Sequence, residues 1–154
     1  MGGTTWFVVS ANAGGYNLYF IDKNTGYVVG GSGTIMKTTN GGTSWISQPD
    51  SVLTRNALSS VFLTSIDTAY AVGQQGVIIK TVNRGVTWFT QNSGTSNNLN
   101  TIFFPDNNIG YAVGDYGIVL RTTDGGTNWI TQYTDSNKFT GPTQNSPTNR
   151  YFYE

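Results

Sequence analysis

The feature that most constrains the fold of this chain is a threefold internal repeat. Three tryptophans at nearly equal spacing each close a similar phrase rich in Thr, Asn, Asp and Gly: Trp45, Trp88 and Trp129. Two other landmarks recur in step, a Tyr-x-Val-Gly segment that begins at Tyr27, Tyr70 and Tyr111, and an apolar run at 18–20, 61–63 and 102–104. Three landmarks that return three times in the same order indicate one structural unit used three times.

Each repeat is predicted to be four short antiparallel strands, which we name a to d in chain order. Strand a is the apolar run, strand b is the Tyr-x-Val-Gly segment, and a tight Gly-x-x-Gly turn leads into strand c. Strand d is expected to begin at the tryptophan. Successive residues of strand c, whose side chains point to opposite faces of the sheet, are apolar, which indicates burial on both faces. No segment has a helical period.

The chain is therefore predicted to be all-β and built from three β-propeller blades, at residues 11–50, 51–92 and 93–135. We interpret residues 1–10 as a leftover outer strand and residues 136–154 as a tail with a possible extra strand. Propeller rings have about 4–8 blades, so three blades do not close a ring. We expect self-association as a homodimer or homotrimer to close it. A β-trefoil, which also has threefold repeats and closes alone, is the alternative.

The turn between strands c and d carries a specific pattern, Thr-x-Asp/Asn-x-Gly-x-Ser/Thr-Trp. An Asp or Asn side chain there can accept hydrogen bonds from backbone N–H groups just ahead of it. Glycine permits the positive φ that such a turn needs. We expect the following residues to be structural: Asn40, Gly42, Trp45, Asn83, Gly85, Trp88, Asp124, Gly126 and Trp129. Calcium takes about 6–8 oxygen ligands, and each turn offers at most one carboxylate, so we predict neither a metal nor a cofactor.

This pattern resembles the Asp-box, or BNR-type, repeat of sialidases and of many non-enzymatic β-propellers. Together with the Tyr-x-Val-Gly segments, it makes the chain most similar to the Ycf48-like family of photosystem II assembly factors. The resemblance covers Leu18 to Gln132 and departs from the strict box at residues 83–86 and at Asn128. It implies a propeller that acts as a protein-interaction or assembly scaffold, with an arginine-rich surface that docks a membrane-protein assembly intermediate.

The residues needed for catalysis are scarce. The chain has no His and no Cys, and its single Glu is Glu154, the last residue. A sialidase-like Tyr–Glu pair cannot be placed, and other glycosidases need two positioned carboxylates. We therefore predict that the chain is not an enzyme. Eight basic residues balance eight acidic ones, which argues against a nucleic-acid partner. No stretch approaches the roughly 18 apolar residues of a membrane-spanning helix.

Two sets of residues are candidates for partner binding. The first set occupies one repeat position at the end of strand c: Lys37, Lys80 and Arg121. These residues could form an arc of positive charge that binds a partner. We favour the interpretation that their long side chains lie over apolar surface while the charged groups stay in water. The variable b–c tips are predicted to lie on the face opposite the boxes, and they contribute Gln74, Gln75, Asp115 and Tyr116. Variable loops on a rigid scaffold are common binding sites.

A glycan-binding, lectin-like module remains the alternative function, because tyrosines that we expect to be exposed could stack on sugars: Tyr16, Tyr116 and Tyr133. The cellular location is not determined by the sequence. A secreted or extracytoplasmic location is favoured, with no signal peptide recognisable in this chain.

Overall fold

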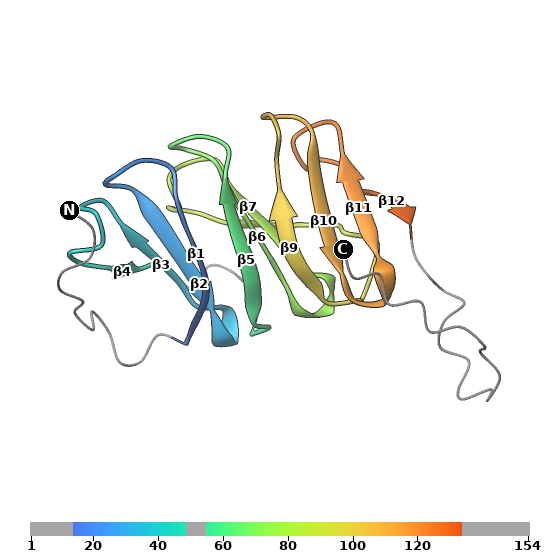
Figure 1. Cartoon of the computed structure of the whole chain (residues 1–154), viewed down its shortest axis with the longest axis horizontal. Coiled ribbons are helices and arrows are strands. Elements are labelled where there is room, and N and C mark those ends of the chain that lie inside the picture. The colour runs from blue at the N-terminus through green and yellow to red at the C-terminus, as the bar shows by residue number, and fades with distance from the viewer. Residues whose placement is uncertain (1–13, 49–54, 134–154) are drawn as a thin grey trace, which may run out of the picture.

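The computed structural model describes residues 14–48 and 55–133 of the chain. They form three four-stranded antiparallel sheets that stand side by side in a row (Figure 1). The strands of each sheet are hydrogen-bonded in sequence order, so each sheet is a simple up-and-down meander. Three single 3₁₀ turns are the only helical elements in the described ranges.

The elements follow one plan in each sheet. Blade 1 contains β1 (Gly15–Phe20), β2 (Gly26–Gly30), η1 (Gly31–Gly33), β3 (Ile35–Thr38) and β4 (Ile46–Ser47). Blade 2 contains β5 (Leu58–Leu63), β6 (Ala69–Gly73), η2 (Gln74–Gly76), β7 (Ile78–Thr81) and β8 (Phe89–Gln91). Blade 3 contains β9 (Leu99–Phe103), β10 (Gly110–Gly114), η3 (Asp115–Gly117), β11 (Val119–Thr122) and β12 (Ile130–Tyr133).

This architecture confirms the predicted all-β propeller blades. The β-trefoil alternative is wrong, because the three repeats form separate sheets and do not share one barrel. The start of strand d was predicted one residue too early: each outer strand begins just after the tryptophan, whose ring belongs to the preceding turn. The strands predicted within 1–10 and 136–154 lie outside the described residues.

The glycine that ends each Tyr-x-Val-Gly segment has a steric cause. A Cβ at Gly73 would lie 2.0 Å from the carbonyl oxygen of Ala57, and the equivalent distances at Gly30 and Gly114 are 1.8 and 1.9 Å. The same Ala57 carbonyl accepts a hydrogen bond from the N–H of Gln74 at 2.9 Å. Only glycine permits strands a and b to approach this closely, and this contact sets where the b–c turn begins.

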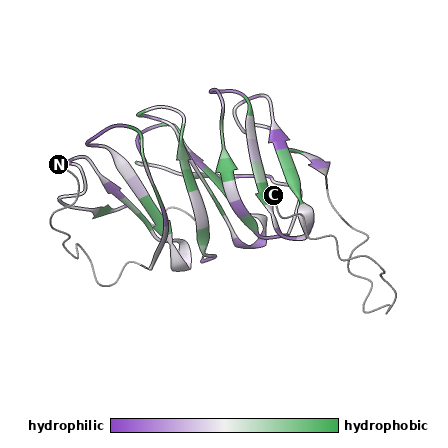
Figure 2. Ribbon diagram, in the orientation of Figure 1, coloured by the Kyte–Doolittle hydropathy of each residue, from purple (hydrophilic) through white to green (hydrophobic). Residues whose placement is uncertain are grey.

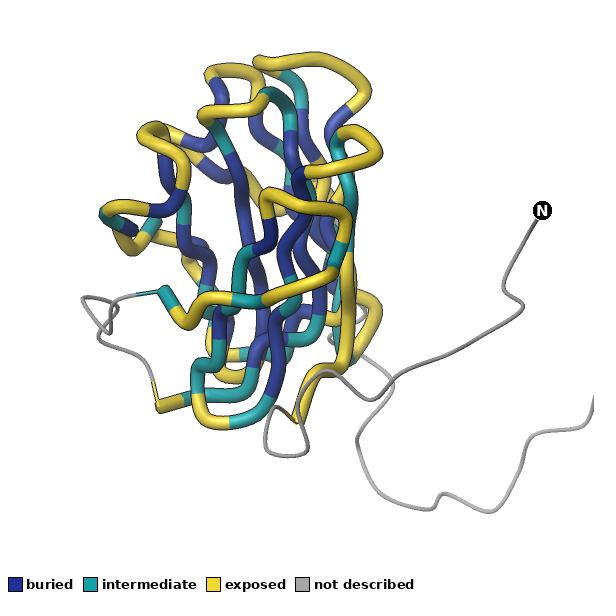
Figure 3. Tube along the Cα trace, turned by 90° about the vertical axis from the view of Figure 1, so that its left-hand side faces the viewer, coloured by how far each residue is buried: buried dark blue, intermediate teal, exposed yellow. Residues whose placement is uncertain are grey.

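The hydrophobic core lies between the blades. The first cluster joins Tyr27, Val29 and Ile35 of blade 1 to the opposing residues of blade 2, and the second joins Tyr70, Val72 and Ile78 of blade 2 to those of blade 3. Figure 2 shows hydrophobic residues along the strands of every blade. Figure 3, which looks along the row, shows buried segments in the interior with exposed loops around them.

Each blade therefore has two faces, which we name by the direction of the chain. The leading face packs on the next blade, and its positions are Tyr27, Val29, Ile35 and Lys37 in blade 1. The trailing face packs on the previous blade, and its positions are Val61, Leu63, Ala71, Ile79 and Trp88 in blade 2. Both faces are buried in blade 2, which accounts for the two adjacent apolar residues of its strand c, Ile78 and Ile79.

The two ends of the row expose the faces that the middle blade buries. On the trailing face of blade 1, Leu18 is 60% exposed, whereas its equivalent Val61 is 2% exposed. On the leading face of blade 3, Tyr111 is 37% exposed, whereas Tyr27 and Tyr70 are each 1% exposed. Within residues 14–48 and 55–133, the row thus has one open trailing face and one open leading face.

Candidate functional site

The c–d turns are closed hydrogen-bond systems built around a buried threonine. In blade 2, the Thr81 hydroxyl donates to the Asn83 side-chain oxygen at 3.0 Å and accepts from the N–H of Gly85 at 3.0 Å. The same Asn83 oxygen accepts from the N–H of Thr87 at 2.9 Å. Thr38 and Thr122 repeat the arrangement in the other blades. The pattern found in the sequence begins with this threonine, two residues before the Asn or Asp in all three repeats, but the threonine was not among the residues expected to be structural.

The third turn differs in chemistry but not in geometry. Asp124 accepts from the N–H and from the side-chain amide of Asn128, at 2.9 and 2.7 Å, and from the Thr122 hydroxyl at 2.8 Å. These hydrogen bonds, with those from Asn128 the strongest, lower the pKa of Asp124 to about 2. Both carboxylate oxygens of Asp124 are therefore engaged within the turn. The departure from the box at Asn128 thus supplies a donor that keeps the turn intact.

The repeated lysines hold neighbouring blades together. The Lys80 ammonium donates to the carbonyl oxygen of Gly125 in blade 3 at 2.7 Å, and the Lys37 ammonium donates to the equivalent carbonyl of Arg84 in blade 2 at 2.8 Å. Each ammonium also lies over the tyrosine opposite it on strand b, at 5.2 Å from the ring centroid of Tyr70 for Lys80. Burial lowers the pKa of both ammonium groups. We call each lysine with its tyrosine a clamp.

In blade 2 the tyrosine of the clamp shares in this contact, whereas the Tyr27 hydroxyl of blade 1 is buried without a hydrogen-bond partner among the described residues. The Tyr70 hydroxyl donates to the same Gly125 carbonyl at 2.8 Å, and burial raises the pKa of Tyr70 to about 12. Gly126, which follows, lies so close to Tyr70 that a Cβ would be 3.1 Å from the ring. The turn of one blade therefore fits against the clamp of the blade before it, and this is a second reason for the glycine at this position.

Arg121 occupies the lysine position in blade 3, opposite Tyr111 in the strand register. Its Nε is buried and has no hydrogen-bond partner among the described residues. The clamp position at the end of the row thus carries a cation without the carbonyl that its two counterparts bind.

The loops of each blade are divided between two opposite ends. The N–H of Gly41 in a c–d turn donates to the carbonyl of Asn24 in an a–b loop, so these connections share one end. The N–H of Gln74 in a b–c turn donates to the carbonyl of Ala57 just before strand a, so the b–c turns and the segments leading into strand a share the opposite end. These hydrogen bonds agree with the face assignment made from the sequence.

The b–c end carries an ordered polar array that spans blades 2 and 3. Asp115 accepts from the side-chain amides of Asn98 and Asn100 at 2.9 and 2.8 Å, which lowers its pKa, with Asn100 contributing most. Asn98 in turn accepts from the N–H of Gln75 at 3.1 Å. The side chain of Gln74 accepts from the N–H of Ala57 at 3.3 Å. The asparagines are a second feature that the sequence did not single out.

Two exposed tyrosines lie at the same end of the blades as this array. Tyr16 and Tyr116 are 64% and 56% exposed, and both lie at the b–c end: Tyr116 in η3, and Tyr16 with its hydroxyl close to Gly31 of η1. Their predicted exposure is confirmed, whereas the side chain of Tyr133 lies outside the described part. The middle residue of each tight turn, Ser32, Gln75 or Tyr116, has a positive φ of 53–58°. Such a φ is uncommon for residues other than glycine and fixes how the side chain is presented.

The other described carboxylates have structural partners. Asp22 and Asp106 each accept two backbone N–H groups at 2.7 Å in the a–b loops, and these hydrogen bonds lower the pKa of both residues. Asp67 forms an ion pair with Arg84 at 2.6 Å. Within 14–48 and 55–133 there is no cluster of three or more His, Cys, Asp or Glu side chains that could hold a metal ion.

The sequence profile of the family described as photosynthesis system II assembly factor YCF48 matches residues 4–82. The chain belongs to this family. The resemblance inferred from the box and from the Tyr-x-Val-Gly segments is thereby confirmed. No curated protein matches the chain.

Solved structures support the fold. A structure described as YCF48 bound to D1 peptide is similar with a TM-score of 0.70 and 23% identity, over 80% of this chain and 42% of that one. YCF48 from Cyanidioschyzon merolae has a TM-score of 0.65 and 22% identity, over 80% of this chain and 38% of that one. The GH74 enzyme of Niastella koreensis has a TM-score of 0.57 and 18% identity, over 77% of this chain and 22% of that one.

The chain thus spans less than half the length of the YCF48 structures that it matches. At these identities the likeness establishes the propeller fold and no more, for the assembly factors and for the glycoside hydrolase alike. Among the described residues, none forms a helix with the length and apolar character needed to cross a membrane.

Proposed function

We propose that this chain is a non-catalytic scaffold that binds an extended segment of a partner protein at the b–c end of its blades. The observation that carries the proposal is the combination at this end of exposed tyrosines with a fixed array of amides and carboxylate, Gln75, Asn98, Asn100 and Asp115. Family membership and the similar YCF48 structure with a bound D1 peptide support a peptide-like partner.

The chemistry of the b–c end suits a polypeptide. Backbone N–H and C=O groups of an extended segment need acceptors and donors at short intervals, which a row of amide side chains supplies. Tyrosines provide a large contact area at a low cost in conformational entropy. The tight turns, with their positive φ, and the hydrogen bonds of Asp115 hold these groups in place before binding, which reduces the entropic cost of association.

In this proposal the lysines have a structural role. Lys37 and Lys80 are occupied by carbonyls of the neighbouring blade, so we assign them to the contact between blades and not to the partner. Since the net charge of the chain is zero, we expect electrostatic steering to contribute little to the association rate.

Isothermal titration calorimetry with a synthetic D1 peptide tests the proposal. We expect saturable binding that Tyr116→Ala weakens at least about tenfold, a loss of ~1.4 kcal/mol. Val86→Ala is the matched control, because Val86 is 64% exposed on a c–d turn at the opposite end of the blades. No binding by the wild-type chain, or equal weakening by both variants, would contradict the proposal.

A glycan is the second candidate ligand, and the exposure of Tyr16 and Tyr116 favours it. Aromatic rings at a rigid loop end can stack on sugar rings. A glycan array separates the two functions: selective binding of one sugar class, lost in Tyr116→Ala, would favour the lectin-like module over the protein scaffold.

We also propose that copies of the chain associate to close a ring. Three described blades fall short of the roughly four needed for the smallest propellers, and the apolar faces at the ends of the row would be covered by such association.

A further inference from the structure

We infer that two copies of the chain join head to tail, with the leading face of blade 3 in one copy packed on the trailing face of blade 1 in the other. This inference rests on the proposed self-association and deepens it by naming the joint. The two open faces are the unpaired halves of an interface that the chain already forms twice within itself, between blades 1 and 2 and between blades 2 and 3.

The polar part of the joint follows from the clamps. Lys37 and Lys80 bind the carbonyls of Arg84 and Gly125, and the residue equivalent to these two in blade 1 is Gly41. Arg121 holds the same place on strand c as the lysines, and its buried Nε lacks a partner in the described structure. The lysines donate through their terminal nitrogen, so we expect the terminal guanidinium nitrogens of Arg121 in one copy to donate to the Gly41 carbonyl of the other.

The aromatic part of the joint follows from a row of rings on the inner strands. Tyr19 and Phe62 have ring centroids 4.7 Å apart, and Phe62 and Phe103 have centroids 5.4 Å apart. The three residues are equivalent in the repeats, so each ring contacts its counterpart in the next blade. Phe103 ends the row and is 55% exposed. In the joint it would contact Tyr19 of the second copy.

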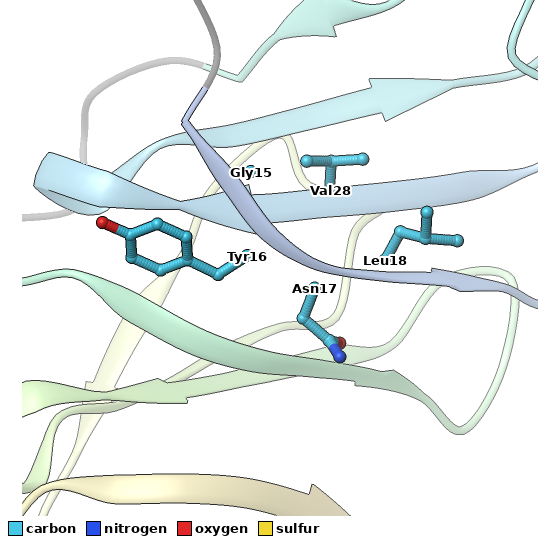
Figure 4. Close-up of a pocket in the computed structure, with 5 residues that line it drawn as sticks. All are labelled: Gly15, Tyr16, Asn17, Leu18 and Val28. Carbon is cyan, nitrogen blue, oxygen red and sulfur yellow. The ribbon is translucent and has the colours of Figure 1, made fainter.

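The apolar part completes the match. Leu18 lies at the position of Val61 and Ile102, which are buried against the preceding blade. Beside Leu18 is a hollow of about 330 Å³, lined by Gly15, Tyr16, Asn17, Leu18 and Val28 (Figure 4). On the opposite face, Val113 and Val119 are only half-buried, whereas their equivalents in blade 2, Val72 and Ile78, are buried. An apolar surface on each copy would thus be covered by the other.

The number of copies follows from the number of blades. A head-to-tail contact forms a closed ring when successive rotations return to the start. The described residues of two copies supply six blades, within the roughly 4–8 of known propellers, and those of three copies would exceed that range. We therefore expect a dimer with two identical joints and twice the mass of the 16.7 kDa chain.

Multi-angle light scattering on the full chain tests the joint through three variants. Leu18→Arg places a charge on the trailing face, and Arg121→Glu reverses the charge on the leading face. Ile46→Arg is the matched control, because Ile46 and its equivalents Phe89 and Ile130 are 54–66% exposed in all three blades and lie outside the interface. Circular dichroism at each step verifies that every variant is folded.

We expect the dimer mass for the wild type and for Ile46→Arg, and the monomer mass of 16.7 kDa for Leu18→Arg and for Arg121→Glu alone. Mixing these two monomers should restore a species of twice the monomer mass, because each retains the face that the other lacks. A wild-type monomer would overturn the self-association and the joint together. A wild-type dimer that persists in both variants, or that only one of them dissociates, would leave self-association intact and overturn the head-to-tail joint. None of these outcomes depends on peptide binding at the b–c end.

Discussion

The contact between blades 2 and 3 gives a quantitative prediction, because two donors share one acceptor. The Lys80 ammonium and the Tyr70 hydroxyl both donate to the Gly125 carbonyl, at 2.7 and 2.8 Å. Removing one donor leaves the carbonyl hydrogen-bonded, whereas removing both leaves it without a partner next to the buried Tyr70 ring. We therefore expect Lys80→Met and Tyr70→Phe to be cooperative when combined.

The magnitudes follow from the geometry. A hydrogen bond from a charged group contributes about 1.5–3 kcal/mol, and the half-buried Lys80 places its bond at the lower end of that range. The contact with the Tyr70 ring adds about 0.5–1 kcal/mol, and the cost of burying the charge offsets part of the sum. We expect Lys80→Met to cost about 1–2 kcal/mol and Tyr70→Phe about 1 kcal/mol. The double variant should lose about 1 kcal/mol more than the sum, which is the cost of an unpaired buried carbonyl.

Urea unfolding followed by circular dichroism measures all four proteins of this cycle. With an m-value of about 1–3 kcal/mol per molar urea, the single variants should unfold at midpoints roughly 0.5–1 M below the wild type. Lys23→Met, on an exposed a–b loop, is the control and should leave the midpoint unchanged. Losses that simply add, or a double variant no less stable than Lys80→Met, would refute the shared-acceptor reasoning.

Three further predictions concern the box turns and the strand contacts. Thr81→Val should cost about 2 kcal/mol, because it leaves the buried N–H of Gly85 without an acceptor, whereas Thr90→Val on the exposed face of β8 should cost almost nothing; urea midpoints compare the two. Asp124→Asn should reduce the loss of stability in acid: with a folded pKa of about 2 and an unfolded value of 3.8, the unfolded chain binds more protons between these values, so stability falls as pH falls through them. Urea unfolding at about pH 5 should therefore show the wild type to be more stable than the variant, and at about pH 2 their free energies of unfolding should be nearly equal. The same difference in free energy at both pH values would count against this. Gly73→Ala should prevent folding or lower the thermal midpoint by about 10 °C or more, since its Cβ would lie 2.0 Å from the Ala57 carbonyl oxygen; a midpoint within a few degrees of wild type would show that strands a and b can separate at little cost.

Much of the fold could be predicted because the internal repeat marks the strands and turns of each blade. Three copies of one phrase identify which residues are constrained by structure, and the Asp, Gly and Trp of the box each have a local reason for their place. The strand order within a blade follows from short turns alone. The burial of strand c on both sides could be predicted because its successive residues are apolar, as the buried pair Ile78 and Ile79 shows.

The candidate site was less predictable, because its key contacts join different blades. The positions of Lys37 and Lys80 were visible in the sequence, but their acceptors lie 47 and 45 residues further along the chain. From the sequence alone, a lysine repeated at the same position as a tyrosine on the neighbouring strand is equally consistent with a charged surface and with a clamp. Only the position of the acceptor carbonyl in the next blade distinguishes the two. The Asn98 and Asn100 amides were missed for the same reason, since neither stands at a repeated landmark.

The measurement that tests the central claim most directly is a cross-link between the open faces. The chain contains no cysteine, so Tyr19→Cys and Phe103→Cys in one chain would introduce the only two thiols. Their counterparts at the internal contacts have ring centroids 4.7 and 5.4 Å apart. A short thiol-reactive bifunctional cross-linker, which does not need the close Cβ approach of a disulfide, should therefore yield a covalent dimer in which position 19 is joined to position 103 of the other copy. Peptide mapping that finds only linkage between two identical positions, or a chain that stays monomeric after cross-linking, would contradict a head-to-tail ring.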